Sequence, residues 1–425
     1  QTVALSERLI DTFNIGLPEG SVDGAGEAAY SVDLSPGEAP RLSASSTLEG
    51  AVLSLPQIGW SKPAGGSGKL AVDAVLGDAP RVDRVSLDAA GLSATGSVSI
   101  RPDGGLDRAR FSSVSVGNWL SAPVELVGRG GGAPAIRVDG GWFDLRNADF
   151  GSSGGGGDSG PIEVRLDRLQ ITDAISLTGF GGNFTTQGGL DGSFRGQVNG
   201  GTPVAGRVVP QRGRTAVQIE SADAGGVIRS AGILRQGHGG SLRLTLLPVG
   251  EAGQFDGTLE VRNTRVRDAP AMAALLNAVS VIGLLDELSG QGILFTEVEA
   301  KFRLGPSVLR LLSSSAVGPS LGISMDGIYE VATGRLDMQG VVSPVYLLNA
   351  IGSVISKKGE GLFGFNYRLR GTAADPKVSV NPLSALTPGG LREIFRAPDP
   401  NRAVRPEPEA PRREPVYDRD TAGGR

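Results

Sequence analysis

The feature that most limits the fold of this chain is an alternation of apolar and polar residues, repeated in short segments along most of the sequence. In its first 250 residues the apolar members of such segments include Val98, Ile100, Ile162, Val164, Leu166, Leu242, Leu244 and Leu246. A period of two with one apolar side is typical of β-strands that are buried on a single face. The sequence therefore predicts an antiparallel meander in which each strand pairs with the next one.

Glycine supports this prediction. It occupies 66 of the 425 positions, which is far above the roughly 7% of average usage. The sequence lacks the Gly-X-Y period that would indicate collagen. Pairs such as Asp139-Gly140 and Asp191-Gly192 favour tight turns, because both residue types tolerate positive φ. We expect many strands joined by many turns, with the glycine tracts at 128–132 and 151–160 forming loops.

Between residues 255 and 396 the alternating segments are interrupted by stretches that predict amphipathic helices. These helices are expected at 271–288, 344–358 and 388–396, the first with Asp268 as its cap and Pro270 in its first turn. The strands between them have as apolar members Val298, Phe302, Leu304, Phe363, Phe365 and Tyr367. This part is therefore expected to combine sheet and helix.

These patterns divide the chain into four segments. We interpret 1–41 as the lead-in of a truncated chain, 42–254 as a β body and 255–396 as the region with helices. The tail at 397–425 is rich in proline and balanced charges and has no apolar period, so we expect it to be disordered. No signal peptide and no apolar run of about 18 residues is visible, so any membrane anchor is expected upstream of this chain.

Composition argues against several classes of function. The net charge of -4 gives no basic footprint for nucleic acid. The chain has no cysteine, and its acidic residues show no ligand spacing, so we expect no disulfide, metal or other cofactor. The single histidine, His238, lies among glycines without a nucleophile motif, which favours an exposed turn over a catalytic base. We predict that the chain is not an enzyme.

The helical stretches allow two interpretations. An amphipathic helix usually packs on its own sheet, and we expect this of 271–288. In the stretch 344–358, an apolar face ends in two lysines, which would also suit an interface with anionic lipid. The candidate membrane-docking residues are Leu347, Leu348, Ile351, Ile355, Lys357 and Lys358.

Several short sequence motifs in the C-terminal region are specific enough to suggest a family. The sequences that carry the likeness are Asp268-Ala269-Pro270, Ser289-Gly290-Gln291-Gly292-Ile293 followed by Phe295, Gly340-Val341-Val342-Ser343-Pro344, Gly361-Leu362-Phe363-Gly364 and the run from Val380 to Arg392. Upstream, the stretches from Pro56 to Lys62 and from Ser221 to Gly226 contribute. Together they resemble the C-terminal region of the AsmA-like proteins, in the YhdP-like branch, over about residues 42 to 396.

The resemblance implies a bridge-like lipid transfer protein of the bacterial cell envelope. Such a protein is held in the inner membrane by an N-terminal helix, and its long β body crosses the periplasm and carries phospholipid toward the outer membrane. The family has no catalytic residues to transfer to this chain. The resemblance also implies that the C-terminal end of the chain meets the outer membrane.

We therefore expect a mainly β fold: an elongated, curved antiparallel sheet that forms an open hydrophobic groove lined by the apolar residues named above. Exposing acyl chains to water costs about 0.8 kcal/mol per methylene, and an apolar groove removes most of that cost. The alternative is a structural scaffold protein of the envelope with a packed β core and no ligand. A carbohydrate hydrolase would need paired carboxylates on neighbouring strands, and the sequence favours no such pair.

Overall fold

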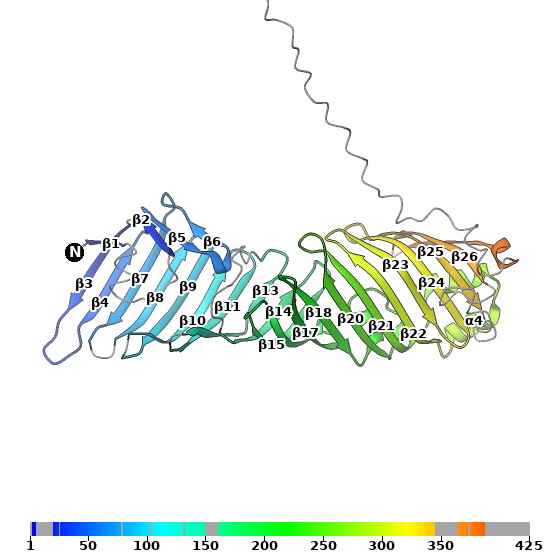
Figure 1. The fold of residues 1–425 in the computed structure, drawn as a ribbon, viewed down its shortest axis with the longest axis horizontal. Helices are drawn as coiled ribbons and strands as arrows, with labels where there is room; N and C mark the ends of the chain where they lie inside the picture. The colour runs from blue at the N-terminus through cyan, green and yellow to red at the C-terminus, as the bar shows by residue number, and fades with distance from the viewer. Residues whose placement is uncertain are drawn as a thin grey trace, which may run out of the picture.

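The structure is a computed structural model, which describes residues 2–5, 20–24, 26–77, 80–102, 104–130, 132–148, 160–344, 364–372 and 375–386. It is an elongated, curved sheet of 24 strands with a small second sheet of three strands (Figure 1). The prediction of a mainly β, elongated and curved fold with short helices is confirmed. The predicted helices at 344–358 and 388–396 and the predicted disordered tail lie outside the described residues.

The strands follow one another in chain order. The first part of the large sheet contains β1 (Thr2–Leu5), β3 (Gly26–Asp33), β4 (Arg41–Ser46), β7 (Gly68–Val75), β8 (Arg81–Ala89), β9 (Leu92–Ile100), β10 (Leu106–Val116), β11 (Leu120–Arg129), β12 (Gly132–Asp139) and β13 (Trp142–Asp144). The middle contains β14 (Ile162–Gln170), β15 (Ser176–Thr185), β16 (Asp191–Val198), β17 (Pro203–Gln211), β18 (Arg214–Ser221), β19 (Gly237–His238) and β20 (Ser241–Pro248). The last part contains β21 (Phe255–Val266), β22 (Ile293–Leu304), β23 (Val308–Val317), β24 (Leu321–Glu330), β25 (Arg335–Pro344), β26 (Phe365–Thr372) and β27 (Pro376–Asn381).

The sheet is mixed, which corrects the prediction of a purely antiparallel one. β12 and β13 both pair with β11 in antiparallel fashion and with β14 in parallel fashion. β12 and β13 lie end to end between β11 and β14, because Gly140 and Gly141, at φ 103° and 77°, bend the chain without reversing it. The predicted turn at Asp139-Gly140 is therefore a bend.

The two long edges of the sheet, where the strands begin and end, differ. The edge where β8 ends at Ala89 and β9 begins at Leu92 is called the insertion rim. The opposite edge, where β9 ends at Ile100 and β10 begins at Leu106, is called the turn rim. All helices and the small sheet that the structure describes belong to connections at the insertion rim. The described connections at the turn rim carry no helix and no strand.

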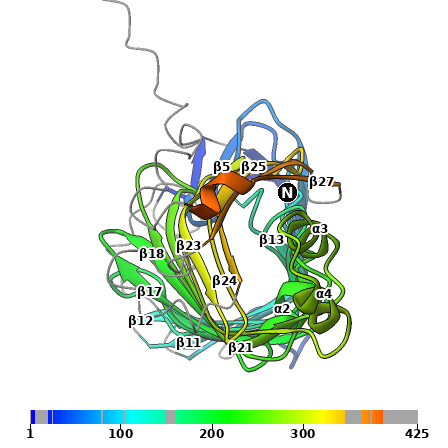
Figure 2. The same ribbon diagram turned by 90° about the vertical axis from the view of Figure 1, so that its right-hand side faces the viewer.

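Three insertions lie at the insertion rim. Between β4 and β7 the chain forms β5 (Ala51–Leu55), the 3-10 helix η1 (Pro56–Ile58) and β6 (Trp60–Lys62), which pair with β2 (Val22–Gly24). The helix α2 (Ala224–Ser230) follows β18, and α3 (Pro270–Ala278) and α4 (Ile282–Ser289) follow β21. Viewed along the long axis, the large sheet forms an arc, and α2, α3 and α4 lie on the same side of it (Figure 2). A second 3-10 helix, η3 (Pro382–Leu386), follows β27.

The helix predicted at 271–288 is divided in two. Val279 ends α3, and Ser280 adopts a left-handed conformation at φ 56°, which an uninterrupted helix does not allow. Asp268 does not cap α3, because it also has a positive φ of 51°, and the capping position falls on Ala269 without a side-chain hydrogen bond. Pro270 lies at the start of the helix as predicted.

Candidate functional site

One face of the sheet is apolar and the other is polar, because the strand registers keep like residues opposite each other. Leu244 of β20 lies opposite Ile219 of β18 and Leu259 of β21. The neighbouring Arg243 lies on the other face, where its Nε donates to Glu220 at 2.8 Å. We name the two surfaces the apolar face and the polar face.

The register produces a feature that no single segment of the sequence reveals. A row of directly paired positions runs from β3 to β27, through every strand between them in the large sheet except β13 and β19, and each of its members is apolar or glycine. The members of this apolar row are Val32, Leu42, Ala74, Val82, Val98, Ala109, Leu126, Ile136, Ile162, Phe184, Gly192, Val208, Val217, Leu246, Gly257, Phe302, Leu311, Gly327, Met338, Leu369 and Val378. About twenty strands at about 4.8 Å per strand give the row a length of about 100 Å.

The insertions cover the apolar face on the side of the insertion rim. Trp60 of β6 packs with Leu92, Val116 and Trp119, and its indole Nε1 donates to the carbonyl of Ala90 at 2.9 Å. The helices α3 and α4 pack with the insertion-rim ends of β21 to β27 in the largest cluster, where Leu276 is fully buried. Half of the apolar face is thus an ordinary packed core.

The other half of the apolar face, on the side of the turn rim, has no such cover among the described residues. Of the predicted lining residues, those that are half-buried toward this rim or in mid-strand and join no core cluster are Val98, Ile100, Ile162, Leu246, Phe302 and Leu304. Leu166, Leu242 and Tyr367 are buried in core clusters, and Val164, Leu244, Val298 and Phe365 pack against such clusters. The structure therefore divides the predicted lining into an uncovered and a covered set.

The remaining predicted residues cannot be placed. Phe363 and the six candidate membrane-docking residues, Leu347, Leu348, Ile351, Ile355, Lys357 and Lys358, lie outside the described residues. Within the described part, no helix is long and apolar enough to cross a membrane.

Cross-strand ion pairs organise the polar face. Glu125 accepts hydrogen bonds from Arg108 Nη1 at 2.8 Å and from Arg110 Nε at 2.9 Å, and these two guanidinium groups, Arg110 first, hold the pKa of its carboxyl below the usual value. Arg368 similarly lowers the pKa of Asp337, which lies 2.8 Å away on the adjacent strand. Arg303 Nε lies 2.7 Å from Asp256 Oδ1. These contacts keep charged side chains paired with one another on the surface that faces away from the apolar row.

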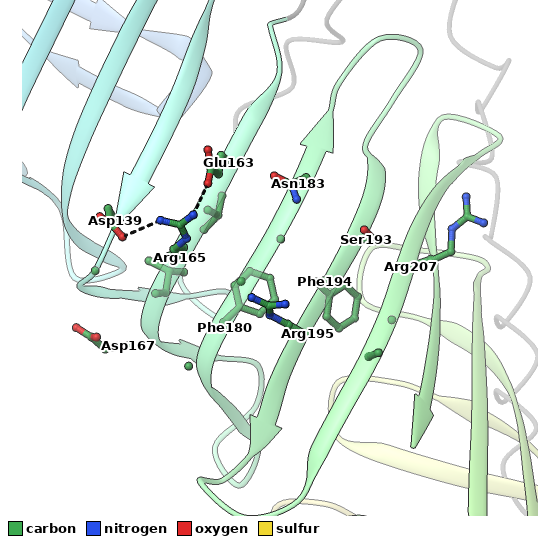
Figure 3. A pocket seen from close by; sticks show the side chains of 18 of the residues that line it. Asp139, Glu163, Arg165, Asp167, Phe180, Asn183, Ser193, Phe194, Arg195 and Arg207 are labelled. Carbon is green, nitrogen blue, oxygen red and sulfur yellow. Dashed lines mark hydrogen bonds and ion pairs between the residues drawn. The ribbon is translucent and has the colours of Figure 1, made fainter. Parts of the chain in front are cut away.

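The polar face is hollowed in the middle of the molecule. A concavity of about 960 Å³ lies over β14 to β18 (Figure 3), where the small residues Gly181 and Ala205 separate larger polar side chains. Arg165 reaches toward Asp139 and Glu163, with its Nη2 at 2.7 Å from Glu163 Oε1. The carboxylates that line the concavity are exposed or ion-paired, so the concavity presents a solvated polar surface.

Potential metal ligands and the single histidine are the other candidates for a functional site. No group of three or more His, Cys, Asp or Glu side chains that could hold a metal ion occurs among them. His238 belongs to the short strand β19 and is exposed, where a turn had been predicted. The most extensive feature of the described molecule is therefore the apolar face.

Sequence reasoning missed part of this feature. Phe184, Val208 and Val217 belong to the apolar row, and their strands carried a period-two signal that we did not assign. Gly192 and Gly257 also belong to it, and a glycine carries no apolar signal by itself. Only the pairing of strands identifies these positions.

Comparison of the chain with family models, with curated proteins and with solved structures finds no match.

Proposed function

We propose that this chain is a segment of a lipid conduit, in which the uncovered half of the apolar face forms a groove for the acyl chains of phospholipids. The observation that carries the proposal is the apolar row, which continues from β3 to β27 without a polar side chain. Three of its members, Phe184, Leu369 and Val378, also pack against core clusters. A ligand that needed one fixed position would need polar groups to hold it there. A row without them suits a ligand that moves along it.

The dimensions fit this ligand. A strand of nine residues such as β9 is about 30 Å long, and one leaflet of a bilayer has a hydrocarbon thickness of about 15 Å, half of the bilayer core. The half of each strand on the side of the turn rim is therefore about as wide as acyl chains are long. Phospholipid head groups would remain in water beyond this rim, so that no charge needs to be buried.

In the full-length protein, this segment would carry phospholipid between the inner and outer membranes of a bacterial envelope, as the family resemblance implies. The anchor in the inner membrane would lie upstream of the chain, and the C-terminal end would face the outer membrane. A phospholipid with two chains of sixteen carbons exposes about thirty methylenes, each worth about 0.8 kcal/mol, when it crosses water unaided. An apolar path removes most of this barrier.

The alternative is a scaffold whose apolar face is fully packed. It has support at the insertion rim, where α3, α4 and β6 form real cores. It does not account for the half-buried apolar residues toward the turn rim, such as Leu246 and Leu304. Purified chain extracted with organic solvent distinguishes the two proposals, because a packed scaffold releases no phospholipid.

Photocrosslinking in cells tests the proposal directly. A photoreactive amino acid at Leu246 or Phe302 is expected to label phospholipid, which mass spectrometry identifies in the adduct. The matched positions Thr245 and Arg303 lie next to them on the polar face and are expected to remain unlabelled. Equal labelling on the two faces, or none on the apolar face, would reject the proposal.

A further inference from the structure

Phenylalanine side chains on the apolar face are repeatedly paired with glycine on the neighbouring strand. Phe302 of β22 lies opposite Gly257 of β21. The same cross-strand pairing joins three further combinations of residues, namely Phe111 with Gly96, Phe184 with Gly192, and Phe194 with both Gly182 and Gly206. The pairing recurs on strands that are far apart in the chain, so it is a property of the face and not of one segment.

The rings occupy the space that a side chain on the glycine would need. A Cβ built on Gly257 would lie 2.2 Å from Cε2 and Cζ of Phe302 and 2.7 Å from Cε1, and these ring atoms are its three nearest neighbours. A Cβ on Gly206 would lie 2.3 Å from Cζ of Phe194. The rings of Phe302 and Phe194 therefore lie down over the backbone of the next strand instead of standing away from the sheet.

This arrangement affects the depth of the apolar face. Side chains in a sheet ordinarily stand roughly perpendicular to it, and a standing phenylalanine would be its tallest feature. A glycine opposite the ring provides a flat place for it, which keeps its apolar area but lowers its height. Gly257 and Phe302 are adjacent members of the apolar row, so the ring lies directly on the path described above.

We infer that the glycine–phenylalanine pairs keep the groove clear for acyl chains, and that Gly257 and Phe302 together set its free depth at β21 and β22. This inference rests on the proposed function. An alanine at Gly257 would force the ring of Phe302 to rotate away from the sheet, because its Cβ and the ring cannot share the same space. The raised ring would then obstruct the row.

The experiment uses the full chain with a photoreactive amino acid at Leu246, which is paired directly with Gly257. The probe is phosphatidylglycerol in small unilamellar vesicles. Gly257→Ala is expected to lower labelling at Leu246 by about tenfold, the factor expected when about two methylene groups lose their apolar contact. Labelling at Leu126, a distant member of the row, should not change in the same variant.

The double variant Gly257→Ala with Phe302→Leu separates obstruction from damage. Without the ring nothing remains to be raised, so labelling at Leu246 should return to within about fourfold of the wild type, the factor that one methylene is worth. Gly65→Ala is the control, since a Cβ there meets no atom within 4 Å. The thermal unfolding of each variant shows whether its fold is retained.

The outcomes are distinct. Normal labelling in a folded Gly257→Ala variant would overturn the inference, and so would a double variant that labels as poorly as the single one. In both cases the wild-type labelling at Leu246 leaves the proposed function standing. A wild-type chain that is not labelled at Leu246 or Leu126 would overturn the proposed function, and the inference with it.

Discussion

The two rims of the sheet follow opposite rules of construction. At the insertion rim, the described connections include all the helices and the small sheet, and these elements bury the ends of the strands in four clusters of apolar residues. At the turn rim, turns such as Arg212-Gly213 join the strands, and the apolar side chains remain half-buried. The difference teaches that one sheet can hold a stabilising core and an uncovered apolar surface side by side.

This division also explains how an uncovered apolar surface is tolerated. The free energy of burial at the insertion rim holds the strands in register, so the turn rim does not need a second layer. The polar face adds cross-strand ion pairs such as that of Arg243 with Glu220. Stability and the proposed transport would then depend on different residues of the same strands.

The largest expected effect is on stability at the insertion rim. Leu276→Ala in α3 removes a fully buried side chain from the largest cluster. We expect the free energy of unfolding to fall by about 3 kcal/mol, the usual cost of such a cavity. Leu246→Ala at the turn rim removes the same atoms from a half-buried position and should cost about half as much. Urea unfolding of both variants measures the difference, and equal losses would contradict the division between the rims.

The amount of bound phospholipid, in contrast, should depend on the apolar row toward the turn rim. Leu246→Asp places a carboxylate in the apolar row. We expect phospholipid retained per purified chain to fall by at least about tenfold, because a charge next to acyl chains costs several kcal/mol. Thr245→Asp is the matched control, since Thr245 lies on the polar face of the same strand. Quantitative mass spectrometry of the extracted lipid measures both, and loss in the control alone would contradict the assignment of the faces.

A smaller effect is expected where a helix of the insertion rim begins. Asp223 caps α2, because its Oδ1 accepts a hydrogen bond from the backbone N–H of Gly226 at 2.8 Å. Asp223→Ala should destabilise this helix by about 1 kcal/mol. Hydrogen exchange at Val227 should become faster, while exchange at the turn-rim end of β20 stays unchanged. Equal acceleration in both places would show that the rims unfold together.

The fold could be predicted from the sequence because the alternation of side chains is a local signal. It places Leu244 and Arg243 on opposite faces without knowledge of the neighbouring strands, as the structure also does. Local signals also identified Pro270 as the start of a helix. They did not reveal that Ser280 would interrupt the helix, because its positive φ depends on how α3 and α4 pack.

The candidate site could be predicted only in part, because it depends on contacts between strands. A bulge between Val82 and Val85 changes which residues of β8 face inward, and alternation alone does not show this. Asp191-Gly192, predicted as a turn, begins strand β16 instead, and Gly192 takes its place in the apolar row through its partner Phe184. The division between covered and uncovered halves follows from the insertions, which fold onto strands distant in sequence.

The smallest expected effect concerns the polar face, where the rims should not differ. Glu125 is held by Arg110 and Arg108, so the pKa of its carboxyl is lower in the folded chain than in the unfolded one. A lowered pKa adds stability above the unfolded value of about 4.3, and this stability is lost as the pH falls through the folded value. Glu125→Gln should therefore cost at most about 1 kcal/mol at pH 7, since the arginines are partly exposed to solvent. The difference from the wild type should shrink as the pH is lowered from about 5 to about 3 in urea unfolding. A difference that grew toward low pH would mean that the carboxyl is held in its neutral form. The charges of this face would then be kept away from the apolar row by something other than the ion pairs.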